Sequence, residues 1–185
     1  TVGIVDKIYS LYDVYESYFD ESTGKPMKAI RNIKEDDYRY YDEVTFDHNQ
    51  NKIQSTKSGS RVVPANIFDM VSAFYYSRRT LFKNIKINDT IKLNTFFEDE
   101  VYPVRVRFVG RETIETKAGK FKALKFIPIV EVGRIFNSED DMKFWVSDDN
   151  NYIPLRVQFD VVISSLKCDL IEYSGIKNSL SKVEK

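Results

Sequence analysis

The clearest structural signal in this sequence is a segment in which every second residue is apolar. It reads Leu155-Arg156-Val157-Gln158-Phe159-Asp160-Val161-Val162-Ile163. Successive side chains of a β-strand point to opposite faces of a sheet, so this period of two predicts a strand with one buried face. The same alternation recurs earlier in the chain, at 38–46, 91–97, 104–108 and 142–146.

Turn residues separate these segments from further predicted strands at 13–19, 27–33, 52–57, 113–116, 121–129 and 166–173. Gly24 and Pro26 mark one turn, and residues 58–60 close a first meander. The run Asp148-Asp149-Asn150-Asn151 forms another turn, because Asp and Asn tolerate positive φ. Gly119 is predicted to be left-handed in its hairpin loop.

One segment breaks the period of two and predicts a helix from Pro64 to Leu81, while a shorter helix is predicted over 5–12. In the longer segment Ile67, Val71, Phe74 and Tyr75 share one helical face, which is expected to pack on the sheet. Asn66 is the predicted N-cap, with Asp69 near the positive end of the helix dipole. Arg78 falls on the inward side, where either Glu112 or the carbonyl groups at the helix end are its expected partner.

The predicted fold is therefore mainly β: a curved antiparallel sheet, open or a half-barrel, that wraps one central helix. Residues 1–176 are expected to form a single β-rich domain. The tail at 177–185 is polar and is expected to fray.

Composition excludes several classes of function. Lys plus Arg and Asp plus Glu both number 28, and a net charge of zero argues against nucleic-acid binding. No apolar run approaches the ~18 residues of a transmembrane span. The lone Cys168 forms no internal disulfide, and His48, the single histidine, lies in a polar turn that predicts a solvated residue.

The acidic clusters at 98–100 and 139–141 lack the Gly-centred alternation of a calcium loop and are predicted to be solvated turns. No phosphate loop, nucleophile elbow or paired catalytic residues are recognisable in the sequence. We therefore predict no catalytic residue, no metal site and no cofactor.

Tyrosines concentrate in the first part of the chain, at positions 9, 12, 15, 18, 38, 40 and 41. Tyr combines a flat apolar face with a hydroxyl, which suits sugars, lipids or a protein partner. The alternative is that these residues form the core and cross-strand pairs of a sheet. The candidate ligand-binding residues are Phe74, Tyr75, Tyr76, Arg78, Tyr38 and Tyr40.

Three motifs carry a resemblance to a known family. They read Asp-Met-Val-Ser-Ala-Phe-Tyr-Tyr-Ser-Arg at 69–78, Gly-Arg-Glu-Thr-Ile-Glu-Thr-Lys-Ala-Gly-Lys-Phe at 110–121 with Pro128, and Trp-Val-Ser-Asp-Asp-Asn-Asn-Tyr-Ile-Pro at 145–154. Together they resemble a domain family of unknown function found in exported proteins of Gram-negative bacteria. The resemblance runs from about Tyr12 to Tyr173, and its structural motif residues are Asp69, Ser72, Gly119, Trp145, Asp148 and Pro154.

The resemblance implies a periplasmic or outer-membrane-associated protein, exported through a signal peptide, with additional strands before Thr1. It also implies an architecture similar to the incomplete barrels of lipoprotein carriers, and it supplies no catalytic residues. The leading hypothesis is a non-enzymatic envelope protein that binds a lipid or another hydrophobic small molecule, or an envelope protein partner. A carbohydrate- or protein-binding module that uses exposed Tyr is the alternative, and an enzyme is the third.

Overall fold

The computed structural model describes residues 12–129, 141–161 and 164–183, and the predicted helix over 5–12 lies almost wholly outside this part of the chain. Within it, the strands form two sheets, one of five strands and one of seven, and the single helix α2 spans Met70–Thr80. This confirms the prediction of a mainly β fold with one helix. Neither sheet closes on itself among the described residues.

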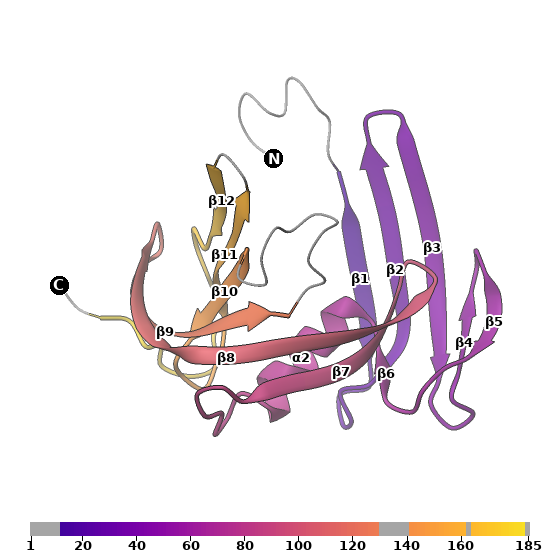
Figure 1. Ribbon diagram of the computed structural model, residues 1–185, viewed down its shortest axis with the longest axis horizontal. Helices are drawn as coiled ribbons and strands as arrows, with labels where there is room; N and C mark the ends of the chain where they lie inside the picture. Colours follow the sequence, from indigo (N-terminus) through magenta and orange to yellow (C-terminus); the bar gives the residue numbers. More distant parts are fainter. Residues whose placement is uncertain (1–11, 130–140, 162–163, 184–185) are drawn as a thin grey trace. The chain divides into compact units, whose positions relative to one another are not determined.

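The first sheet is an antiparallel meander in which each strand pairs with the next along the chain (Figure 1). Its strands are β1 (Val14–Phe19), β2 (Pro26–Glu35), β3 (Tyr38–Asp47), β4 (Lys52–Ser55) and β5 (Gly59–Val62). The sequence pattern assigned the start of β5 to a closing turn, because Gly-Ser-Arg-Val shows no apolar alternation. Only its pairing with β4 reveals the fifth strand.

The second sheet has the strand order β12-β11-β10-β9-β8-β7-β6. Its strands are β6 (Ile67–Phe68), β7 (Thr90–Phe97), β8 (Glu100–Thr116), β9 (Gly119–Pro128), β10 (Met142–Ser147), β11 (Pro154–Val161) and β12 (Ser164–Asp169). The strands predicted at 104–108 and 113–116 are one 17-residue strand, β8. Its register against β9 shifts between Phe108 and Gly110, where a φ of 144° at Gly110 accommodates the bulge.

The chain divides into two compact units, each with its own apolar core. Unit 1 contains the described residues up to Tyr76 together with 93–103, and unit 2 contains 77–92 and the described residues from 104 onward. The core of unit 1 consists of Val44, Ile53, Val63, Ile67 and Phe96. The core of unit 2 consists of Ile114, Phe121, Ala123, Trp145, Ile153 and Leu155.

The helix α2 begins at Met70, six residues later than predicted, and the predicted cap Asn66 is wrong. Asn66 has a φ of 56°, which is not the extended conformation of an N-cap, and the next two residues form the short strand β6. Asp69 is the cap instead. Its Oδ1 atom accepts hydrogen bonds from the amides of Val71 at 2.9 Å and Ser72 at 3.0 Å.

The buried face of α2 also differs from the predicted face. Ser72, Ala73 and Ser77 are buried, whereas Phe74 is half-buried and Tyr75 is 44% exposed. Ile67 is buried as predicted, but it belongs to β6 rather than to the helix. The predicted buried face was derived from helical spacing that starts at Ile67. Because α2 begins only at Met70, that spacing does not apply to Ile67.

Residues 178–183 hydrogen-bond to the rest of unit 2, although their polar composition predicted a frayed tail. The Lys122 amide donates to the Ser181 carbonyl at 2.9 Å, and the Val183 amide donates to the Lys120 carbonyl at 2.8 Å. Gly119 lies beside this segment with a φ of 133°, so its positive φ is confirmed. A Cβ atom at position 119 would stand 2.5 Å from Lys182 Cε.

His48 is half-buried rather than solvated. Its Nε2 atom lies 2.7 Å from the carbonyl oxygen of Pro26, and its ring stacks on Phe46 with centroids 6.2 Å apart. The predicted turn is present, but Phe46 and the Pro26 carbonyl contact the imidazole and partly bury it.

Candidate ligand-binding site

The candidate site is built around Arg31, on the face of the first sheet that also carries the core of unit 1. Tyr15 on β1, Arg31 on β2 and Asp42 on β3 are directly opposite one another in the strand register. Directly opposed residues of antiparallel strands point to the same face, so these three side chains lie together. The Ile33–Tyr40 pair, two residues further along, adds Tyr40 to the same face.

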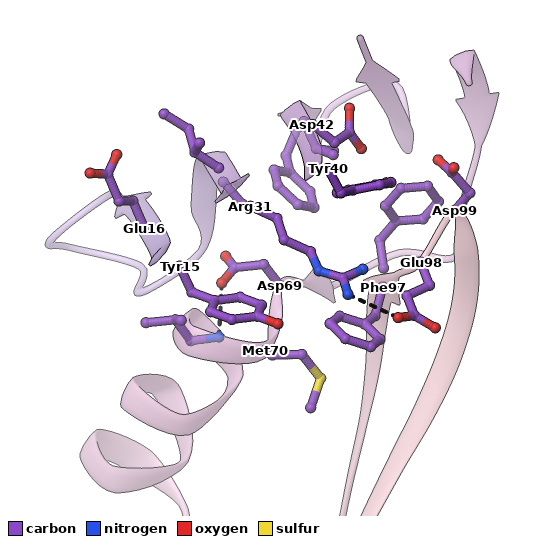
Figure 2. A pocket seen from close by; sticks show the side chains of 16 residues that line it. Tyr15, Glu16, Arg31, Tyr40, Asp42, Asp69, Met70, Phe97, Glu98 and Asp99 are labelled. Atoms are coloured by element: carbon purple, nitrogen blue, oxygen red, sulfur yellow. Dashed lines mark hydrogen bonds and ion pairs between the residues drawn. The ribbon is translucent and has the colours of Figure 1, made fainter. Parts of the chain in front are cut away.

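Three aromatic rings surround the Arg31 guanidinium (Figure 2). Its carbon Cζ lies 4.8 Å from the ring centre of Phe97, 4.9 Å from that of Tyr40 and 5.9 Å from that of Tyr15. Rings within about 6 Å of a cation attract it through their negative faces. We call this hollow the Arg31 pocket; its lining includes Tyr15, Glu16, Arg31, Tyr40, Asp42, Asp69, Met70, Phe97, Glu98 and Asp99.

A tight turn between β7 and β8 brings two carboxylates to this pocket. Glu98 and Asp99 have φ values of 51° and 62°, so both occupy the left-handed region that two-residue hairpin loops of type I′ require. Glu98 Oε1 accepts a hydrogen bond from Arg31 Nη2 at 2.9 Å. The predicted turn at 98–100 is therefore real, but the prediction that it is only solvated missed its contact with Arg31.

The first turn of α2 forms another wall of the pocket. The parallel pairing of β6 with β7 aligns Phe68 with Thr95, which places Asp69 and Met70 beside the end of β7. Asp69 Oδ2 accepts a hydrogen bond from Ser17 Oγ of β1 at 2.7 Å. The pocket has a volume of about 50 Å³. That space holds roughly three to five water-sized groups, which is too little for a whole acyl chain.

The charges of the pocket perturb the titration of its members. Burial works to lower the pKa of Arg31, but hydrogen bonding and charge interactions with Tyr15 and Glu98 outweigh it and raise that pKa. Burial raises the pKa of Tyr40, and the charges of Asp42 and Asp99 raise it further. Both directions are those expected beside several carboxylates.

Two buried polar atoms of the pocket lack a hydrogen-bond partner among the described residues. They are the donor Arg31 Nε and the acceptor Asp99 Oδ1. More than 90% of buried polar groups in folded proteins have a partner, so two orphans in one pocket are notable. Two residues that line the pocket, Arg31 and Asp99, thus carry a donor and an acceptor without a partner, and Tyr15, 44% exposed, adds a ring at its entrance.

Of the candidate ligand-binding residues, only Tyr40 lines the Arg31 pocket; the motif residue Asp69 also lines it. Tyr38 lies at the start of β3 and is exposed, while Tyr75 stacks on Phe19 and Tyr76 packs on Phe68. Arg31, Phe97 and Asp99 were not predicted. Arg31 is at every-second-residue spacing from Ala29 and Ile33, so it belongs to the inward-facing series of this strand. A charged residue in such a series was the sequence signal that could have indicated the site.

Of the remaining motif residues, Gly119, Trp145, Asp148 and Pro154 lie in unit 2 and Ser72 lies in unit 1. Glu112, a predicted partner of Arg78, instead accepts a hydrogen bond from Trp145 Nε1 and lies 3.5 Å from Lys125 Nζ. Arg78 Nε donates to the Asn151 carbonyl, so a carbonyl does accept from it, although not one at the helix end. Asp148 pairs with Arg111 at 3.1 Å, Pro154 starts β11, and Ser72 is part of the cap of α2.

The described residues contain no helix with the length and apolar character needed to cross a membrane. They also contain no group of three or more His, Cys, Asp or Glu side chains arranged to hold a metal ion.

A family comparison covers the three motifs. The model of the family described as "Protein of unknown function (DUF3108)" matches residues 1–171. The chain belongs to the DUF3108 family. This match includes all three motifs and confirms the resemblance to a family of unknown function. No curated protein and no solved structure matches the chain. Membership of DUF3108 assigns no ligand or reaction, so function has to be argued from the Arg31 pocket.

Proposed function

We propose that this DUF3108 protein is a non-enzymatic binding module whose ligand occupies the Arg31 pocket. The observation that carries the proposal is the arrangement of three rings around a guanidinium beside two unpartnered buried atoms. Concave sites with apolar walls and a few converging polar groups are the usual ligand sites of proteins. Rings supply contact area, and the polar atoms set the orientation of the ligand.

The ligand of this site is amphipathic rather than purely apolar. The leading sequence hypothesis was a lipid or acyl chain held in a half-barrel, and a volume of about 50 Å³ leaves room for only one end of such a molecule. Burying an alkyl group against Arg31 and Asp99 would leave their polar atoms without partners, which is unfavourable. The proposal therefore places the polar end of the ligand in the pocket and its apolar part along Tyr15.

The proposed location is the bacterial envelope. Its support is the resemblance of the three motifs to exported proteins, and fractionation of the source cells tests it directly. Release of the protein by osmotic shock or with outer membranes is expected. Recovery with the cytoplasmic fraction alone would contradict this location without affecting the proposed site.

A titration with n-octyl β-D-glucoside below its micellar concentration tests the binding function, because this probe has both a polar ring and an apolar chain. Backbone amide shifts in nuclear magnetic resonance spectra should change first near Tyr15, Arg31 and Phe97. Tyr15→Ala should weaken binding about tenfold, since it removes the ring at the entrance.

Tyr18→Ala is the matched control. Tyr18 is on the same strand and similarly exposed, at 48%, but it is opposite Lys28 and so points to the other face of the sheet. Equal affinities of the two variants, or shifts confined to other surfaces, would refute the proposed site.

A further inference from the structure

We infer that the polar end of the ligand is a neutral hydroxylated ring, that is, a saccharide unit, whose hydroxyl groups enter the Arg31 pocket. This inference rests on the proposed function and specifies its ligand class. It follows from the charge of the pocket, its unpartnered atoms and the strain of its turn.

The charge of the pocket lining favours a neutral head group. Among the described residues, the pocket lining has a single cationic side chain, Arg31, and five carboxylates, those of Glu16, Asp42, Asp69, Glu98 and Asp99. This excess of negative charge repels a carboxylate or phosphate head group. A cationic head group is also disfavoured, because Arg31 already occupies the centre of the three rings.

The hydrogen-bonding groups of the pocket favour a ligand with hydroxyl groups. Asp42 and Asp69 are already occupied: Ser55 and Thr56 donate to Asp42, and Ser17 and Ser72 donate to Asp69. The unused groups are therefore the donor Arg31 Nε and the acceptor Asp99 Oδ1. A hydroxyl both donates and accepts, so the hydroxyls of a sugar can serve as partners for a donor and for an acceptor, whereas an alkyl chain satisfies neither.

The third argument is backbone strain. Glu98 and Asp99 are consecutive non-glycine residues with φ values of 51° and 62°. Asn-Gly would adopt this turn with less strain, and strained backbone in proteins concentrates at ligand sites. Here the turn holds one carboxylate on Arg31 and the other inside the pocket. The exposed face of Tyr15 then offers the flat surface on which the C–H groups of a sugar ring stack.

The experiment tests the polar head group and the apolar chain of the ligand separately. The probes are four methyl glycosides without a chain (of glucose, galactose, mannose and N-acetylglucosamine), n-octyl β-D-glucoside, and octanoate and octyl phosphate as anionic amphiphiles. We expect at least one methyl glycoside to shift the amides of the pocket, and the two anionic probes to bind at least tenfold more weakly than octyl glucoside.

Variants then test the two unused atoms. Asp99→Ala and Arg31→Lys should each weaken glycoside binding at least fivefold, the second because lysine keeps the charge but has no donor at the Nε position. Glu100→Ala is the matched control, since Glu100 is the next acidic residue and lies outside the pocket lining. Glycoside binding should keep its wild-type affinity in the Glu100 variant.

The outcomes separate the two proposals. Tyr15-dependent binding of octanoate or octyl phosphate, with no glycoside binding, would overturn the saccharide inference and leave the binding site standing. Glycoside binding that is unaffected by Asp99→Ala and Arg31→Lys would also overturn the inference. Binding of no probe at the pocket would overturn both.

Discussion

Asp69 and Ser72 hydrogen-bond to each other's backbone amides at the start of α2. Asp69 Oδ1 accepts from the Ser72 amide at 3.0 Å, and Ser72 Oγ accepts from the Asp69 amide at 3.1 Å. This reciprocal arrangement is a capping box formed by Asp and Ser. Both side chains are buried, and Asp69 Oδ2 also accepts from Ser17 Oγ on β1, so the helix cap is tied to the sheet of unit 1.

The first prediction concerns this cap. Asp69→Ala should lower the free energy of unfolding by about 2 kcal/mol, because it removes an N-cap and the carboxylate that accepts from the Ser17 and Ser72 hydroxyls. Asp69→Asn keeps an acceptor for the helix amides and should lose less than half as much. Urea denaturation measures both, and a wild-type midpoint for Asp69→Ala would refute the cap.

The second prediction concerns the partner of Glu112. A double-mutant cycle with Glu112→Gln and Trp145→Phe should give a coupling of about 1 kcal/mol, because the indole N–H donates to a partly exposed carboxylate. The same cycle with Arg78→Ala in place of Trp145→Phe should give a coupling near zero. A larger coupling to Arg78 than to Trp145 would restore the pairing that the sequence suggested.

The third prediction is that the strained turn beside the Arg31 pocket destabilises the folded protein. Asp99→Gly should raise the free energy of unfolding by about 1 kcal/mol, since glycine adopts positive φ without strain and the unpartnered carboxylate disappears. Asp37→Gly, in the β2–β3 turn, is the control. Asp37 does not have a positive φ, so glycine there should not stabilise the protein. Equal effects at the two positions would contradict strain at Asp99.

The fourth prediction is a pH dependence of the C-terminal segment. Burial works to raise the pKa of Asp149, but hydrogen bonds from Ser181 and Asn151 outweigh it and lower that pKa. A carboxyl whose pKa is lowered by folding stabilises the folded form above its unfolded pKa, about 3.9, and this contribution is lost as pH falls through the folded pKa.

Hydrogen exchange of the Ser181 amide, corrected for its intrinsic pH dependence, measures this effect. Protection should be constant from pH 7 to about 5 and should fall below pH 4, as protonation weakens the 2.8 Å bond from the Ser181 amide to Asp149 Oδ2. Asp149→Asn should reduce protection at neutral pH and remove its dependence on pH. Protection in the wild-type protein that does not fall at all as the pH drops below 4 would refute the role of Asp149.

The sequence by itself determined the local elements of this protein. Strand alternation located β3, β7, β10 and β11 closely, and Gly and Asp-Asn clusters located their turns, because side-chain period and turn conformation depend on neighbouring residues. It also identified one helix of the right type, although not its start. The positive φ of Asn66, which ends the case for an N-cap there, depends on the pairing of Ile67 and Phe68 with β7.

The tertiary structure alone decided which residues form the Arg31 pocket and which acids pair with which partners. Arg31, Phe97 and Asp99 come from segments up to 68 positions apart, and only the strand register and the left-handed turn bring them together. Glu112 likewise meets Trp145 because β8, β9 and β10 are neighbours in one sheet. Long-range strand register depends on how whole faces of the sheet pack. It therefore cannot be predicted from a local pattern of residues.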